Sequence, residues 1–115
     1  MKYTAGVFAK YVVTCYPDET VFDASKKMFD KHVGSVVIVS ETDLPIGILS
    51  ERDIVNRVVV QAKDTKKTKV KDVMTPNPVT LESSEPLEVV FEHIGRKFRH
   101  LPITEEGRLV GIVSL

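Results

Sequence analysis

The stretch that decides the fold is Gly34-Ser35-Val36-Val37-Ile38-Val39, followed by Ile46-Gly47-Ile48-Leu49-Ser50-Glu51-Arg52-Asp53. Each segment contains a short, mainly apolar run that is typical of a buried strand: Ser35-Val36-Val37-Ile38-Val39 in the first and Ile46-Gly47-Ile48-Leu49-Ser50 in the second. The polar residues Glu41-Thr42-Asp43-Leu44-Pro45 between them predict a turn. The sequence therefore predicts a strand, a turn and a second strand that leads into a helix.

The same order recurs later in the chain. The second copy has a strand, a turn and a strand at His100-Leu101-Pro102-Ile103-Thr104, Glu105-Glu106-Gly107-Arg108 and Val110-Gly111-Ile112-Val113-Ser114. Upstream, Thr14 and Glu19 of the first copy are separated by the same interval as Thr80 and Glu85 of the second. Duplication of one unit is the most economical explanation of this self-similarity.

Helical stripes complete both copies. Apolar residues recur at helical spacing at Val21, Ala24 and Met28 in the first copy, and at Leu87, Val90, Phe91 and Ile94 in the second. A further helix is expected from Glu51 to Ala62, with Ile54, Val55, Val58 and Ala62 on one side. The β-branched cluster Val58-Val59-Val60 makes that segment a middling helix former.

These elements predict an α+β (mixed α/β) fold with two pseudo-symmetric β-α-β-β-α repeats. Repeat 1 with its lead-in is expected over residues 1–62, and repeat 2 over residues 70–115. Residues 63–69 contain no apolar side chain and should form a solvated linker. One helix cannot cover both faces of a sheet, so the repeats should pack against each other through their sheets.

Composition excludes several classes of protein. The chain has 115 residues with 16 basic and 16 acidic side chains, so no global field attracts nucleic acid or a membrane surface. No apolar run approaches the length of about 20 residues that crosses a bilayer. A single cysteine, Cys15, and the lack of an apolar leader fit a cytoplasmic protein. The basic run from Lys63 to Lys71 has no interleaved aromatic residue, so nucleic-acid binding is not expected.

The quoted segments resemble the CBS-domain family, and the chain is identified as a member with a tandem CBS pair, a Bateman module. In that family a Gly-apolar-x-Ser/Thr-x-x-Asp segment leads from strand to helix, as Gly47 to Asp53 does here. Val70-Lys71-Asp72-Val73-Met74-Thr75-Pro76 is similar to the family's lead-in before a second repeat. The resemblance implies a regulatory module without catalytic activity. It also implies that AMP, ADP, ATP or S-adenosylmethionine binds in a cleft between the repeats.

The resemblance also implies roles for particular residues. Asp53 corresponds to the family's ribose-binding aspartate, and Ser50 would meet a phosphate, with charge supplied by Arg52 and Arg99. The strands offer flat walls and backbone groups for adenine. The expected ligand-binding residues are Thr14, Gly34, Ser35, Val36, Ile48, Ser50, Arg52, Asp53, Thr80, Arg99, His100, Leu101, Pro102 and Ser114.

Other interpretations of the same residues remain open. Ser50-Glu51-Arg52-Asp53 also fits a capping box, which would explain Ser50 and Asp53 without any ligand. The histidines and Cys15 lack metal-ligand spacing, so no metal or catalytic cofactor is expected, and Cys15 is interpreted as a partly buried residue in a turn. His100 fits a phosphate contact or a packing residue with one satisfied nitrogen.

The second signature stops at Ser114-Leu115, before its own aspartate and helix. This truncation is expected to leave apolar surface around Ile112 and Val113, which a homodimer or a partner protein would bury. A regulated enzyme or transporter is a candidate partner. An alternative to the regulatory function is a scaffold in which the cleft stays empty and the fold serves only to dimerise.

Overall fold

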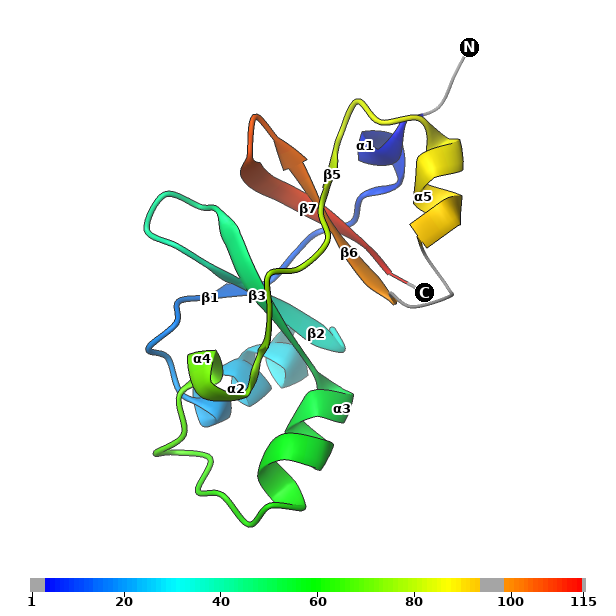
Figure 1. Cartoon of the computed structure of the whole chain (residues 1–115). Helices are drawn as coiled ribbons and strands as arrows, with labels where there is room; N and C mark the ends of the chain where they lie inside the picture. Colours follow the sequence, from blue (N-terminus) through cyan, green and yellow to red (C-terminus); the bar gives the residue numbers. More distant parts are fainter. Residues whose placement is uncertain (1–3, 94–98, 115) are drawn as a thin grey trace. The chain divides into compact units, whose positions relative to one another are not determined.

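The computed structural model describes residues 4–93 and 99–114 of the chain. It divides into two compact units (Figure 1). The first, which we call the central unit, is continuous and runs from Val13 to Asn77. The other, which we call the terminal unit, combines Met1–Val12 with Pro78–Leu115. Each has its own sheet with its own helices, which confirms the mixed α+β fold with two repeats.

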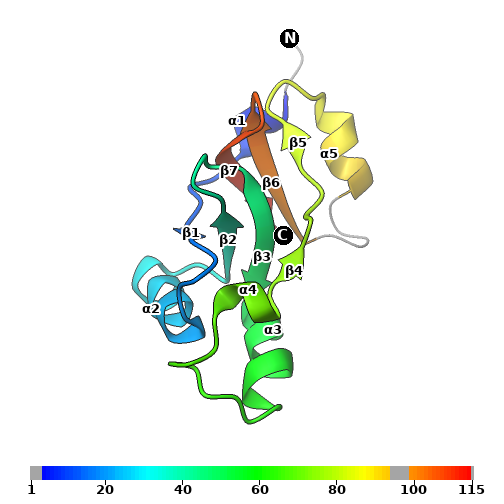
Figure 2. The ribbon, with the colours of Figure 1, turned by 60° about the vertical axis from the view of Figure 1, so that its left-hand side comes forward.

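The central unit is built on a four-stranded sheet in the order β1-β2-β3-β4 (Figure 2). Its strands are β1 (Thr14–Cys15), β2 (Ser35–Val39), β3 (Pro45–Ser50) and β4 (Thr75–Pro76). β1 and β2 are parallel, whereas β2 with β3 and β3 with β4 are antiparallel. The strand-turn-strand prediction is therefore confirmed for this unit.

Short helices complete the central core. They are α2 (Val21–Lys31), α3 (Glu51–Ile54), the π-helix η1 (Val55–Val59) and α4 (Val70–Val73). Val21, Ala24 and Met28 of α2 are buried, as their spacing predicted. They pack against strand residues that include Val36, Ile38 and Leu49. Burial of a side chain of this kind stabilises a fold by roughly 1.5–3 kcal/mol.

The helix predicted from Glu51 to Ala62 is shorter and changes its hydrogen bonding. The α-helix ends at Ile54, and Val60 N–H then donates to Val55 O at 3.0 Å, a π-type bond. This wider turn changes which side chains face inward. Val58 is buried in the core, but Val55 and Ala62 are exposed, so the predicted apolar side was only partly right.

The expected linker, residues 63–69, is part of the central unit. Val21 N–H donates to Thr68 O at 2.9 Å, and Phe22 N–H donates to Thr65 O at 3.0 Å. The Lys66 ammonium lies 5.1 Å from the centre of the Phe22 ring. The stretch is therefore fixed to the first turn of α2, although its own side chains are polar.

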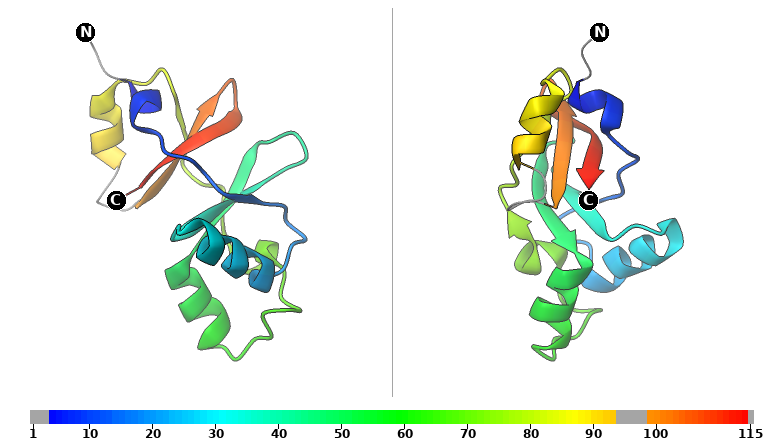
Figure 3. Two further views of the ribbon diagram at one scale, coloured as in Figure 1. Left: turned by 180° about the vertical axis from the view of Figure 1, so that it is seen from behind. Right: turned by 90° about the vertical axis from the view of Figure 1, so that its right-hand side faces the viewer.

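The terminal unit has a three-stranded sheet in the order β5-β6-β7. Figure 3 shows its strands β6 in orange and β7 in red. Its elements are α1 (Ala5–Phe8), β5 (Leu81–Glu82), α5 (Leu87–His93), β6 (His100–Glu105) and β7 (Arg108–Ser114). Ala5 and Val90 pack against Leu81, Leu101 and Ile103 in its core. Phe91 is 65% exposed, so its predicted place on the buried stripe was wrong, because α5 turns Val89 and Val90 inward instead. Ile94 lies outside the described residues.

The pairing registers of the strands correspond between the two repeats. Cys15 pairs with Ile38 in the central unit, and Leu81 pairs with Ile103 in the terminal unit. The register of each antiparallel pair shifts directly after Ile38 and after Ile103. The duplication inferred from the sequence therefore extends to a local irregularity of the sheet.

The lead-in segments are paired in a way that the sequence did not predict. Val70 N–H of α4 donates to Glu19 O, and Ala5 N–H of α1 donates to Glu85 O, each at 2.8 Å. The segment from Ala5 to Lys10 thus takes the place beside the second repeat that 70–76 takes beside the first. Each repeat is completed by the lead-in that stands in front of the other repeat in the sequence.

This arrangement corrects the expectation of bare apolar surface at the end of the chain. Lys10 N–H donates to Ile112 O at 2.7 Å, and Ile112 N–H donates to Lys10 O at 3.1 Å. Ile112 is buried and Val113 is half-buried and packs against the terminal core. The N-terminal lead-in, rather than another protein, covers Ile112.

Candidate functional site

Several of the sequence-predicted site residues share one face of the central sheet. Thr14 pairs with Val37, Val37 pairs with Ile48, and Ser35 pairs with Ser50. Paired residues on neighbouring strands project to the same side, and alternate residues along a strand return to that side. Thr14, Ser35, Ile48 and Ser50 therefore lie on one face, which we call the candidate face. Thr14, Ile48 and Ser50 are half-buried there.

Val36, another predicted ligand-binding residue of the central unit, lies on the other face of the sheet. Val36 is fully buried among the core residues beneath the helices, and its counterpart Leu101 has the same place in the terminal unit. The side chains of these two residues therefore belong to the two hydrophobic cores.

Ser50 and Asp53 form a capping box at the start of α3. Asp53 N–H donates to Ser50 Oγ at 3.2 Å, and Ser50 N–H donates to Asp53 Oδ2 at 2.9 Å. Gly34 closes on the same helix end, since Glu51 N–H donates to Gly34 O at 3.0 Å. A Cβ at Gly34 would lie 2.6 Å from Glu51 Oε1. The structural interpretation of Ser50 and Asp53 is therefore correct as geometry, and it leaves Asp53 Oδ1 outside the cap.

Asp53 Oδ1 faces an arginine that the sequence analysis missed. Arg57 Nη2 lies 3.7 Å from this oxygen, and Arg57 Nη1 donates to Val73 O at 2.9 Å. The Asp53 side chain is 18% exposed. The spacing of four residues from Asp53 was a signal for this contact, because such residues are neighbours on a helix.

The terminal unit presents its predicted residues in a similar way. His100 pairs with Ser114 across β6 and β7, and their side chains lie within hydrogen-bonding distance, 3.0 Å from Nδ1 to Oγ. Pro102 is two residues further along the same face of β6, and Thr80 directly precedes β5. Arg99, which precedes His100 in the sequence, is exposed. Arg52 in the central unit is also exposed. The structure thus groups His100 with Ser114 within this unit.

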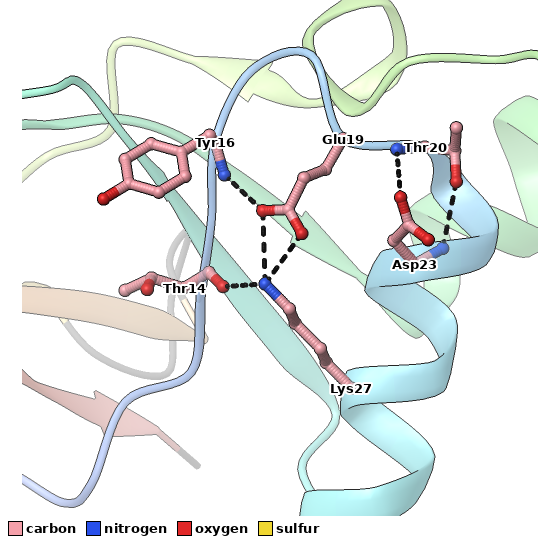
Figure 4. A network of polar contacts seen from close by, with 6 residues as sticks. All are labelled: Thr14, Tyr16, Glu19, Thr20, Asp23 and Lys27. Carbon is pink, nitrogen blue, oxygen red and sulfur yellow. Dashed lines mark hydrogen bonds and ion pairs between the residues drawn. The ribbon is translucent and has the colours of Figure 1, made fainter.

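A second polar network supports the end of β1. Lys27 Nζ donates to Thr14 O at 2.9 Å and pairs with Glu19 Oε1 at 2.9 Å (Figure 4). Glu19 Oε2 accepts from Tyr16 N–H at 2.6 Å. Beside it, Thr20 and Asp23 form another capping box. Lys27 of α2 therefore binds the backbone carbonyl of Thr14, and the Thr14 side chain takes no part in this contact.

Cys15 lies within strand β1 and not in a turn. It is 1% exposed and packs in the central core. Burial raises the pKa of its thiol to about 11, with Lys27 acting in the opposite direction. Thiolate is the reactive form of cysteine, so this residue is a packing residue.

Within residues 4–93 and 99–114, no group of three or more His, Cys, Asp or Glu side chains is placed to hold a metal ion. None of the helices in this part of the chain has the length and apolar character needed to cross a membrane.

Comparison with known proteins gives consistent results. A family model described as the CBS domain matches residues 6–60 and 70–115. An uncharacterised protein of Methanopyrus kandleri is 41% identical over 106 residues, which cover 90% of this chain and 54% of that protein. The chain spans about half the length of this relative and of others, and less of some.

Solved structures share the fold. An uncharacterised conserved protein from Pyrococcus horikoshii is 30% identical with a TM-score of 0.84, and the match covers 99% of this chain and 87% of that one. A hexameric CBS-CP12 protein from bloom-forming cyanobacteria is 28% identical with a TM-score of 0.87, covering 99% and 65%.

Proposed function

The chain belongs to the CBS-domain family, and we propose that it is a regulatory module that binds an adenosyl nucleotide and signals its presence to a partner. AMP, ADP, ATP and S-adenosylmethionine share the adenosine that such a site would recognise. The single observation that carries the proposal is Asp53. Its Oδ2 completes a helix cap while Oδ1 stays outside the cap at the end of the candidate face.

The chemistry of Asp53 suits a ribose. A carboxylate oxygen accepts hydrogen bonds from vicinal hydroxyls, and bonds to a charged acceptor contribute roughly 1.5–3 kcal/mol each. Ser50 adds a half-buried hydroxyl beside it, and Arg52 adds an exposed positive charge one residue away. In the terminal unit, Arg99 and the His100–Ser114 pair supply similar polar chemistry. These groups support binding of a polar, anionic or cationic nucleoside derivative, and they include no constellation for catalysis.

The central unit contains its own control for this proposal. Thr20 and Asp23 form a capping box with almost the same geometry as Ser50 and Asp53, with hydrogen bonds of 3.1 Å in both directions. Asp23 has no proposed role in ligand binding. A variant at Asp23 therefore measures what loss of a cap alone does to this unit.

The test begins with a thermal-shift panel of AMP, ADP, ATP and S-adenosylmethionine. A ligand at 100 times its dissociation constant adds roughly 2.7 kcal/mol to stability, which a small domain shows as a shift of several degrees. Isothermal titration then compares wild type with Asp53→Ala, Asp53→Asn and Asp23→Ala. We expect Asp53→Ala to weaken binding by at least about tenfold and Asp53→Asn to weaken it less.

Asp23→Ala should leave the affinity unchanged. Both alanine variants should lose about 0.5–2 kcal/mol of stability through their caps. Unchanged affinity in folded Asp53→Ala would reduce Asp53 to a capping residue.

A second candidate function is a ligand-free interaction scaffold that dimerises. A groove of 510 Å³ in the central unit favours it, because its lining mixes polar groups with apolar side chains such as Phe29 and Val55, which are largely exposed. We propose that a second copy of the chain covers this groove. The protein is proposed to be cytoplasmic, and its regulated partner is proposed to be an enzyme or a transporter. The oligomeric state of the CBS-CP12 neighbour is in keeping with such assembly.

Sedimentation of wild type and Phe29→Ser tests the dimer. A specific interface should bury more than about 1,000 Å² in total, so the wild type should sediment as a dimer at tens of micromolar. A wild-type monomer at that concentration would refute it. A dimer that shows no thermal shift with any of the four ligands would favour the scaffold.

A further inference from the structure

Arg57 links two parts of the central unit that are distant in sequence. Its guanidinium donates through Nη1 to the carbonyl of Val73 at 2.9 Å, and Nη2 lies 3.7 Å from Asp53 Oδ1. Val73 is 3% exposed and is the last residue of α4. One planar side chain thus stands between the carboxylate proposed to bind ribose and the lead-in segment of the second repeat.

The two oxygens of Asp53 are in different situations. Oδ2 is occupied by the cap, where it accepts from Ser50 N–H. Oδ1 faces Arg57, so a ribose hydroxyl that donates to Oδ1 must share this oxygen with the guanidinium or displace it. Ligand binding at Asp53 therefore changes the electrostatic environment of Arg57 directly.

The other end of Arg57 reaches a segment with a connecting role. α4 is followed by β4, which pairs with β3 at Gly47 and Ile48, and Ile48 belongs to the candidate face. The chain then leaves the central unit after Asn77. A change at the Val73 carbonyl consequently acts on residues 70–76, through which the chain runs on to the second repeat.

The π-helix places Arg57 for this contact. η1 starts directly after Ile54, and its wide turn buries Val58 while the neighbouring Arg57 crosses to α4. A π-segment is less favourable than a regular α-helix and is frequently found at functional sites. It begins two residues after Asp53, so the proposed ligand-binding aspartate and Arg57 lie on one continuous helical segment.

We infer that Arg57 is a positioning residue that couples occupancy of Asp53 to the lead-in segment 70–76. This inference rests on the proposed function, which it deepens by naming the route by which ligand binding is signalled. Arginine suits the role because its fork of donors serves two acceptors at once, whereas a lysine ammonium is a point charge.

The test measures amide hydrogen exchange of residues 70–76 with and without AMP, in wild type, Arg57→Met and Arg57→Lys. Methionine keeps the aliphatic stem and removes the guanidinium. Lys26→Met, which removes an exposed positive charge from α2, is the matched control. AMP should change exchange of 70–76 by about threefold or more in wild type and in Lys26→Met, a size typical of coupling between sites.

In Arg57→Met and Arg57→Lys this response to AMP should be lost, while isothermal titration still detects binding with an affinity within about tenfold of wild type. Retention of the response in Arg57→Met, or its absence in wild type that binds AMP, would overturn the coupling. If AMP fails to bind wild type but another nucleotide of the panel binds, the same measurement is made with that nucleotide.

A ligand-free arm separates this inference from the proposed function. Asp53→Asn keeps the cap acceptor but weakens attraction to Arg57, so it should speed exchange of 70–76 by about twofold or more in wild type and not in Arg57→Met. Additive effects of the two substitutions would overturn the link even if nucleotides bind. A non-additive result in a protein that binds no nucleotide would keep the link and refute the ligand.

Discussion

Ser35 and His100 occupy the same place in the two units, and each is paired with a serine across two antiparallel strands. In the central unit the partner, Ser50, starts a helix and caps it together with Asp53. In the terminal unit the partner, Ser114, lies within hydrogen-bonding distance of the His100 ring. The same strand frame therefore carries a helix cap with a carboxylate in one repeat and an imidazole–hydroxyl pair in the other.

The comparison shows that the frame and the chemistry of these repeats vary independently. Strand register, the irregularity after the fourth residue of β2 and of β6, and the position of the lead-in are shared. The polar groups at the strand ends differ. Substitutions at matched positions of the frame should consequently differ in effect only through the local packing around each position.

The largest expected effect concerns Ile38 and Ile103, which are identical residues at matched positions with no exposed surface. We expect Ile38→Ala and Ile103→Ala each to lower the free energy of unfolding by about 2–5 kcal/mol, because each leaves a cavity. Ile38→Ala should have the larger effect, since Val58 and Val70 of the surrounding helices enclose the central core. Urea unfolding measures both variants.

Ile→Val at the same two positions is the control and should cost about 0.5–1.5 kcal/mol. A loss below about 1 kcal/mol for either alanine variant would show that its site collapses around the cavity, which would contradict the matched packing.

A sharper contrast is expected at Gly47 and Gly111, the matched glycines of β3 and β7. A Cβ at Gly47 would meet the flexible end of the Met74 side chain, whereas a Cβ at Gly111 would lie 2.7 Å from Ala9 Cβ and 3.1 Å from Lys10 O. A side chain can change rotamer, but backbone atoms move only with their segment. Gly111→Ala should therefore cost about 1–3 kcal/mol.

Gly47→Ala should cost clearly less in the same denaturation experiment. The double variant Gly47→Ala/Met74→Ala provides the control, because removal of the Met74 side chain opens space for the new methyl group. Equal losses for the two single variants would mean that the two lead-ins are held with equal rigidity.

The smallest expected effect is a pH dependence in the central unit. Burial raises the pKa of Cys15 to about 11, whereas Leu81 stands at the matched position of the terminal unit and does not titrate. In the unfolded chain the Cys15 thiol ionises at its ordinary pKa of 9.0, whereas in the folded protein it stays protonated to higher pH. Rising pH therefore favours the unfolded state once the unfolded thiol begins to ionise. Stability from this residue should thus be complete below about pH 9 and decline towards pH 11.

Cys15→Val should remove this part of the alkaline decline, as measured by thermal unfolding between pH 8 and pH 11. An identical decline in wild type and Cys15→Val would assign the effect to lysines and tyrosines instead. Native Cys15 should also react with iodoacetamide only after unfolding.

Much of the frame followed from local sequence pattern. The run from Ser35 to Val39 forms β2 with the predicted bounds, and the spacing of Val21, Ala24 and Met28 identified the buried side of α2. These predictions succeeded because strand and helix periodicity depend on neighbouring residues alone. The prediction that Phe91 is buried was wrong, because the rotation of α5 against its sheet decides which of its apolar residues is buried.

Non-local pairing limited the rest of the prediction. Nothing in Ala5 to Lys10 itself shows that its partners are Glu85 and Ile112, and this contact reversed the expected exposure of Ile112. The π-type bond at Val55 also depends on how Val58 fits the core. For the candidate site, the Ser50–Asp53 cap could be predicted from its spacing, but the reach of Arg57 to Val73 could not.

The exchange of lead-ins has a consequence for folding during synthesis. The central unit is continuous, so all its strands and α4 have been synthesised once Asn77 has emerged from the ribosome. The segment from Ala5 to Lys10 is made before it but must wait for Ile112, which is added last among its partners. Since domains fold as units when their residues become available, the central unit should fold first and the terminal unit only after the strand that contains Ile112 has also emerged. The cost of closing so long a loop rises only logarithmically with length, so the delay is set by the ribosome more than by the search for contacts.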